Sequence, residues 1–197
     1  SVKAIVDAYD GSVRLFRWDD QDPILRTWEK IYPGSVEPVS AISGDLMSHL
    51  RYPEDMFKVQ RNLLATYHVT DAAGFYSGGD RWRLAEETST HGAASSSDSS
   101  TRVDAAGNPV PAPTALQPPY YLTMQMPGQD SAEFSLTSVF VPGGGGEGRR
   151  EAMAGFLAVD SETGNTPGQV REGYGKLRLL ALPSSTTVPG PGQVQNK

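Results

Sequence analysis

The chain has 197 residues, a length that suits one domain, or one domain with a long insertion. Its 17 Lys and Arg residues and 23 Asp and Glu residues give a net charge of −6 without a basic stripe, which argues against nucleic-acid binding. The absence of Cys excludes disulfides, thiolate metal sites and cysteine nucleophiles, and no stretch approaches the ~20 apolar residues of a membrane-spanning helix.

The first 18 residues predict a β-hairpin. β-Branched and aromatic residues flank Asp10-Gly11, which is a favoured two-residue turn. The first strand would begin at about Val2, and residues 184–197 have the Pro/Gly composition of a linker. We therefore expect the chain to be a piece cut from a larger protein.

The stretch after the hairpin predicts a helix that begins at Pro23. Asp22 is a favourable N-cap, Pro at the first helical position loses no hydrogen bond, and Pro33-Gly34 ends the helix. The apolar residues share one helical face: Ile24, Leu25, Trp28, Ile31 and Tyr32. We expect this face, with Trp28 at its centre, to be buried against a β-sheet.

A longer helix is predicted to begin after Pro53. Glu54 and Asp55 lie in its first turn, where the helix dipole favours acidic side chains. The predicted buried residues are Met56, Phe57, Leu63, Leu64 and Tyr67. Gln60 and Arg61 are predicted to face solvent or a partner. A short helix at 46–50 is predicted before this helix, and a helical turn and a strand around Trp82 after it.

Residues 86–116 interrupt this pattern. The segment is rich in Ser, Ala, Pro and Gly and has no aromatic residue, so it cannot bury enough surface to offset the entropy of ordering. We predict that residues 1–197 form a single domain, in which 86–116 is a mobile insertion and 184–197 is a C-terminal linker.

The second half of the chain predicts an antiparallel sheet. Four strand-like segments are separated by turn clusters: 120–126, 133–141, 152–160 and 176–183. Short connections between consecutive strands favour a meander, which the N-terminal hairpin could extend. With the helices packed on one face, the predicted fold class is α+β.

No complete catalytic constellation is present in the sequence. His49 and His68 lie on predicted helices and His91 lies in the insertion, but no G-x-S-x-G elbow accompanies them. The position of His68 near the end of a predicted helix is better explained by a favourable interaction of its charge with the helix dipole than by a catalytic pairing with Asp71.

The acidic residues and the glycine-rich turn also have simpler interpretations. Helix capping explains Asp22, and turn preference explains Asp19 and Asp20. The turn at 160–165 lacks the spacing of a calcium loop, and the segment at 143–150 lacks the Lys and helix of a phosphate-binding loop. We therefore predict no catalytic, cofactor-binding or metal-binding residue.

The pair Tyr120-Tyr121 has two possible roles. It could form part of a peptide- or glycan-binding face, or it could pack in the core or on the sheet surface. Packing is the interpretation we favour.

Several long stretches resemble one known family, among them VKAIVDAYDGSVRLF, DLMSHLRYPEDMFKVQRNLLATYHVTD and QPPYYLTMQMPGQDSAEFSLTSVFVP. Shorter ones are DPILRTW, FYSGGDRW, FLAVDSETG and YGKLRLLALPSSTTVPGPGQVQN. The family is an uncharacterised group of very large multi-pass membrane proteins found mainly in actinobacteria. Only the 86–116 segment and the glycine-rich turn fall outside the resemblance.

The resemblance implies a location rather than an activity. Members carry several N-terminal transmembrane helices followed by a long extracytoplasmic region, and this chain is similar to a central part of that region. It implies a non-catalytic module in envelope assembly, sensing or transport, whose partner is the rest of its own membrane protein.

A hydrolase-type domain acting on envelope glycans or lipids is the alternative. Its candidate carboxylates are the groups at Asp19–Asp22 and Glu54–Asp55. A pocket lined by two facing carboxylates would favour this enzyme, whereas a flat polar surface would favour the module.

Limited proteolysis tests the predicted insertion. We expect the first cuts within residues 90–112, with both halves remaining associated, because this composition offers no large apolar anchor. Mass spectrometry of the first fragments identifies the sites. First cuts within 54–67 would contradict the domain interpretation.

Overall fold

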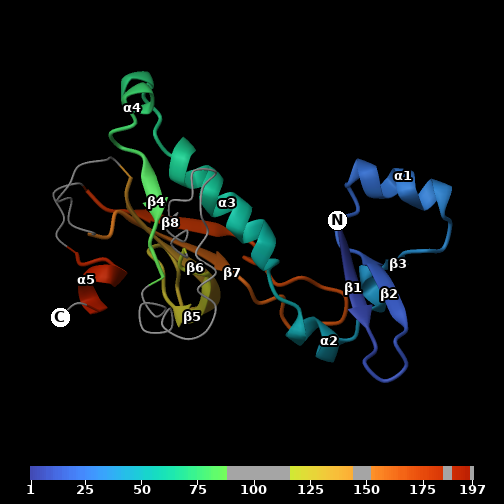
Figure 1. The fold of residues 1–197 in the computed structure, drawn as a ribbon. Helices are drawn as coiled ribbons and strands as arrows, with labels where there is room; N and C mark the ends of the chain where they lie inside the picture. Colours follow the sequence, from blue (N-terminus) through green and yellow to red (C-terminus); the bar gives the residue numbers. More distant parts are fainter. Residues whose placement is uncertain (88–115, 144–151, 184–187, 196–197) are drawn as a thin grey trace, which may run out of the picture. The chain divides into compact units, whose positions relative to one another are not determined.

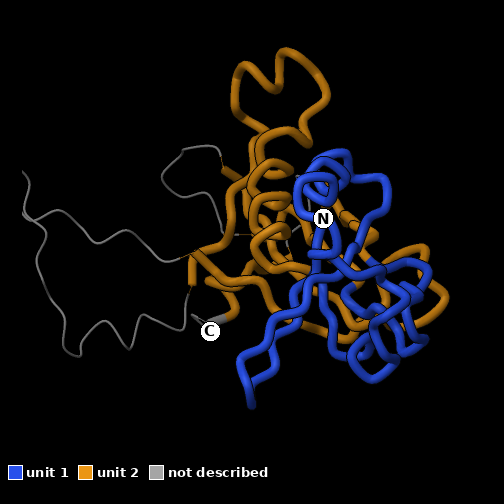
Figure 2. The backbone as a smooth tube through the Cα atoms, turned by 90° about the vertical axis from the view of Figure 1, so that its right-hand side faces the viewer, with its two compact units in different colours: residues 1–52, 161–174 blue, residues 53–160, 175–197 orange. Residues whose placement is uncertain are grey.

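The structure is a computed structural model that describes residues 1–87, 116–143, 152–183 and 188–195 (Figure 1). The chain divides into two compact units (Figure 2). Unit 1 comprises residues 1–52 and 161–174, and unit 2 comprises residues 53–160 and 175–197. Each unit has its own β-sheet. The fold class is α+β, as predicted.

The sheet of unit 1 begins with the predicted hairpin. β1 (Val2–Val6) pairs antiparallel with β2 (Val13–Arg17), and β3 (Glu37–Pro38) pairs parallel with β2. The expected two-residue turn is wrong, because residues 7–12 form the connection. The carboxylates of Asp7 and Asp10 accept hydrogen bonds from the backbone N–H groups two residues later, which stabilises this wider loop.

The predicted helix is α1 (Pro23–Ile31), capped by Asp22 as expected. The Asp22 carboxylate accepts hydrogen bonds from the N–H groups of Ile24 and Leu25 at 2.9 and 3.2 Å. The expected burial of its apolar face is wrong. Leu25 alone is buried, and Trp28 is 53% exposed and stacks on Tyr32 at a centroid distance of 5.6 Å.

The core of unit 1 explains this difference. Phe16, Ile42 and Met47 are fully buried, and the partly buried residues around them are Ile5, Trp18, Val39, Leu46 and Leu50. These residues come from the hairpin, the 3-10 helix η1 (Val39–Ala41) and α2 (Gly44–His49). No residue of α1 belongs to this cluster, so the described structure leaves most of the apolar face of α1 exposed.

The segment 161–174 completes unit 1. The Thr163 hydroxyl donates a hydrogen bond to the Met47 carbonyl at the end of α2. Lys3 Nζ lies 4.9 Å from the ring centroid of Trp18 and donates to the Arg51 carbonyl at 3.2 Å and the Tyr174 hydroxyl at 3.4 Å. Burial lowers the pKa of Lys3.

Unit 2 contains a second sheet whose neighbouring strands are all antiparallel. Its strands are β4 (Trp82–Leu84), β5 (Tyr120–Met124), β6 (Glu133–Pro142), β7 (Gly155–Asp160) and β8 (Leu177–Ala181). β6 pairs with β7 along one side and with β5 and β4 along the other. The predicted meander is confirmed. The prediction that the N-terminal hairpin extends it is wrong, because the hairpin pairs with β3 in unit 1 and packs Phe16 there.

α3 (Glu54–Tyr67) lies across one face of this sheet (Figure 1). Phe57, Arg61 and Ala65 are its buried residues. The predicted exposure of Arg61 is therefore wrong, as is the predicted burial of Leu63 and Tyr67. Arg61 Nη1 donates to the Gln117 carbonyl at 2.9 Å and the Ser138 hydroxyl at 3.1 Å, which offsets part of the cost of burying the guanidinium. Met56, also expected in the core, is exposed.

Two short helices complete unit 2. α4 (Ala72–Ser77) follows α3, and α5 (Pro191–Gln195) lies within the predicted C-terminal linker. A bridge between Glu86 and Leu116 joins the two ends of the predicted insertion, whose residues 88–115 lie outside the described part. None of the described helices is both long and apolar enough to cross a membrane.

Two aromatic truncations in unit 1 test the assignment of its core. Phe16→Ala should lower the free energy of unfolding by about 3–5 kcal/mol, because the ring is fully buried. Trp28→Ala should cost less than about 1 kcal/mol, because half of that side chain faces solvent. Chemical denaturation measures both midpoints, and a larger loss for Trp28→Ala would show that the face of α1 is packed.

Candidate functional site

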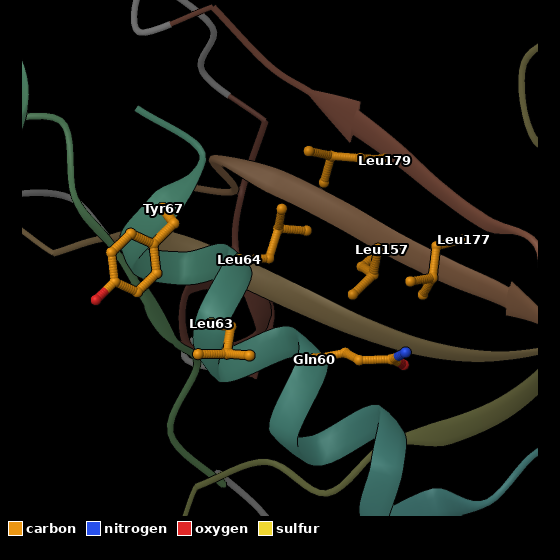
Figure 3. A pocket seen from close by; sticks show the side chains of 7 residues that line it. All are labelled: Gln60, Leu63, Leu64, Tyr67, Leu157, Leu177 and Leu179. Carbon is orange, nitrogen blue, oxygen red and sulfur yellow. The ribbon is translucent and has the colours of Figure 1, made fainter. Parts of the chain in front are cut away.

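A groove in unit 2 runs between α3 and the strands β7 and β8. Its volume is about 400 Å³. The lining residues come from the helix and from two neighbouring strands: Gln60, Leu63, Leu64, Tyr67, Leu157, Leu177 and Leu179. Figure 3 shows the helix side chains on one wall and the strand side chains on the other. We call this feature the α3–β8 groove.

The helical wall exists because α3 has more apolar surface than the sheet covers. Phe57 and Ala65 pack inward, and a second apolar stripe at spacings of three and four residues lies beside them. Its members are exposed: Met56, Val59, Leu63 and Tyr67. Tyr67 also stacks on Phe75 of α4 at a centroid distance of 5.8 Å.

The strand wall follows from the alternation of β8. Leu177 and Leu179 are opposite Val159 and Leu157 of β7, on the face that α3 covers, whereas Arg178 lies on the other face. Leu177 and Leu179 are 41% and 40% exposed, and Leu63 across the groove is 54% exposed. Several large apolar side chains therefore remain in contact with solvent at one place, which is typical of a binding surface.

The chemistry of the groove suits binding rather than catalysis. Its only polar side chains are the amide of Gln60 and the phenol of Tyr67. A carboxylate, imidazole or amine in position to transfer a proton is what a hydrolytic site needs, and the groove lining contains none. The arrangement can bind an apolar group by removing leucine surface from water.

The carboxylates considered from the sequence have local partners. Asp19 accepts a hydrogen bond from the backbone N–H of Gln21 at 2.9 Å, and Asp20 lies 3.5 Å from Arg17. Asp22 caps α1.

The other two carboxylates, Glu54 and Asp55, both pair with Lys58, at 2.7 and 3.3 Å. These are ion pairs on the exposed first turn of α3, and neither acid lines the groove.

The histidines have structural surroundings. His68 is the C-cap residue of α3: its Nδ1 lies 3.1 Å from the Leu64 carbonyl, and its ring stacks on Trp82 at 3.6 Å. Asp71 caps α4 by accepting from the N–H of Gly74 at 2.7 Å. His49 is exposed in the last turn of α2, and His91 lies outside the described residues.

The two tyrosines of β5 contact neighbouring side chains, although Tyr120 is 43% exposed and Tyr121 39% exposed. Tyr120 donates its hydroxyl proton to Glu87 at 2.8 Å, and this hydrogen bond raises the pKa of Tyr120. Tyr121 stacks on Phe134 of β6 at 5.1 Å.

Among the described residues of the other two segments considered from the sequence, none lines the groove. In the acidic turn, Asp160, Ser161 and Thr163 are buried, and Thr163 bonds to α2. Across the described residues, no group of three or more His, Asp or Glu side chains is placed to hold a metal ion. Of the glycine-rich turn, only Gly143 is described.

The groove was not predicted because the orientation of α3 differs from the expected one. Leu63 and Tyr67 were expected in the core and Arg61 toward solvent or a partner, whereas Leu63 and Tyr67 are exposed and Arg61 is buried. The sequence does contain one indication of the groove, which is the width of the apolar face of α3. Met56 and Val59 extend this face beyond what one side of a sheet can cover.

The sequence signature of the Uncharacterised protein family (UPF0182) matches residues 1–197, the whole length of the chain. The chain belongs to this family. The UPF0182 protein of Leifsonia xyli subsp. xyli is 53% identical over 196 residues, which cover 100% of this chain and 18% of the relative. The UPF0182 proteins of Paenarthrobacter aurescens and Tropheryma whipplei are 50% and 48% identical, again over 100% of this chain but only 18% and 20% of theirs.

The chain spans about a fifth of the length of the curated UPF0182 relatives it matches. No solved structure matches it. The family is described only as uncharacterised, so its name gives no activity. The groove is therefore the feature from which a function can be argued.

Proposed function

We propose that this chain is a non-catalytic binding module of a much larger UPF0182 membrane protein, and that the module lies on the extracytoplasmic side. The observation that carries the binding role is the α3–β8 groove, whose lining holds five leucines and no carboxylate, imidazole or amine. A module of this kind serves envelope assembly, sensing or transport by contacting an apolar partner.

Two observations support a module over a free-standing enzyme. The relatives are about five times longer than the chain, so most of each relative lies outside the matched region. The candidate carboxylates are each engaged in a cap, a turn or a short-range ion pair. The membrane location rests on the resemblance of the sequence to multi-pass proteins.

Binding of an apolar fluorescent probe tests the groove. Anilinonaphthalene sulfonate gains emission at apolar sites, so the unsubstituted chain should bind it. The double variant Leu63→Ser/Leu179→Ser should lose most of this emission, because it makes both walls polar. The matched control is Ile24→Ser/Ile31→Ser, which removes two exposed apolar residues from α1 instead. An equal loss in the control would show that the groove is not the site.

Thiol labelling tests the location. The 197 residues contain no Cys, so Tyr9→Cys in the full-length protein adds one thiol at a fully exposed position of the β1–β2 loop. A membrane-impermeant maleimide should label this thiol in intact cells. Labelling of the unsubstituted full-length protein measures the background from any thiols outside residues 1–197. Labelling that appears only after cell lysis would place the module on the cytoplasmic side.

A further inference from the structure

The open edge of β8 lies beside the groove. β8 pairs with β7 on one side, and no described strand pairs with it on the other. Such an edge presents a row of backbone donors and acceptors to another strand, and proteins usually cover or protect it.

The register of β7 and β8 shows which backbone groups face outward. Leu182 N–H donates to the Ala154 carbonyl at 2.9 Å, and Asp160 N–H donates to the Lys176 carbonyl at 3.3 Å. Bonded and non-bonded pairs alternate in an antiparallel ladder. The N–H and C=O groups of Leu177 and Leu179 therefore point away from β7, toward the open edge.

The same two residues line the α3–β8 groove with their side chains. A strand added beside β8 would form main-chain hydrogen bonds with Leu177 and Leu179. Alternate side chains of that strand would point to the face where α3 and the leucines lie. Main-chain pairing supplies affinity and the groove supplies selectivity, as in other complexes where a peptide extends a sheet.

We propose that an extended segment of the same polypeptide, from outside residues 1–197, pairs with the open edge of β8 and seats alternate apolar side chains in the α3–β8 groove. This inference rests on the proposed role of the chain as a module of a larger protein. It goes further by naming the occupant and its conformation.

The length of the relatives favours an occupant from the same chain. This region makes up about a fifth of each relative, so about four-fifths of the polypeptide is available to cover the edge. A segment tethered by a short flexible linker is present at an effective concentration in the millimolar range, which a separate partner seldom reaches.

The positive charge on β8 indicates which residues the occupant carries on its face away from the groove. Lys176 and Arg178 lie on the face of β8 away from the groove, and neither takes part in an ion pair among the described residues. A second copy of β8 would bring like charges together on this face, which is unfavourable. An occupant with apolar residues toward the groove and acidic or polar residues opposite is complementary to both faces.

Photo-crosslinking in the full-length protein identifies the occupant. p-Benzoylphenylalanine replaces Leu63, an exposed residue of the groove wall, and the irradiated protein is digested and analysed by mass spectrometry. The expected adduct joins position 63 to a peptide of the same polypeptide outside residues 1–197. The matched control carries the probe at Tyr76, an exposed aromatic position of α4 outside the groove lining, and should not yield this adduct.

Two substitutions at one position then test strand pairing. Leu179→Ala removes the side chain and keeps the outward N–H, whereas Leu179→Pro also removes the N–H without breaking a bond to β7. If the occupant is a strand, Leu179→Pro should lower the adduct yield about fivefold further than Leu179→Ala, the loss expected for one backbone hydrogen bond.

Several outcomes would overturn the inference. An adduct with a second copy, with another protein or with lipid would each name a different occupant, and no adduct at position 63 would leave the groove empty. Equal yields for Leu179→Ala and Leu179→Pro would show that side chains alone hold the occupant. Adduct mapping needs no proline variant, so it decides the question even if Leu179→Pro does not fold. Thiol labelling at Tyr9→Cys reports the membrane side separately.

Discussion

The buried guanidinium of Arg61 fixes how α3 lies on the sheet of unit 2. Its Nη1 bonds to the Gln117 carbonyl and the Ser138 hydroxyl, while its Nε has no hydrogen-bond partner among the described residues. Burial lowers the pKa of Arg61 because desolvation opposes the charge. With Arg61 held against β6, the helix turns Leu63 and Tyr67 outward, and the groove beside β8 follows from that orientation.

Local chemistry made much of the fold predictable from the sequence. Asp22-Pro23 specifies the start of α1, and the strands β5 to β8 follow from β-rich segments between turn clusters. The orientation of α3 was not predictable, because Arg is rarely buried and its partners Gln117 and Ser138 are distant in sequence. The groove depends on that orientation and on the position of β8 at the sheet edge, so the wide apolar face of α3 does not by itself locate it.

In this structure, polar side chains have mainly structural roles, whereas exposed apolar side chains form the candidate binding site. Most of the conspicuous polar residues, such as Asp22, Asp71 and Thr163, are engaged in caps or in bonds between segments. Several large apolar residues, in contrast, lack such contacts on part of their surface, since their side chains remain exposed on α3 and β8. This is why the candidate site is recognised by surface left uncovered rather than by reactive groups.

The hydrogen bond from Thr163 to Met47 spans 116 residues of sequence. Unit 1 is built from residues 1–52 and from a segment, 161–174, that the ribosome makes only after β4 to β7 of unit 2. During synthesis the hairpin and α2 therefore emerge long before the residues that complete their packing. Contacts this distant in sequence slow folding, so the hairpin and α2 cannot complete their packing until most of unit 2 has also been made.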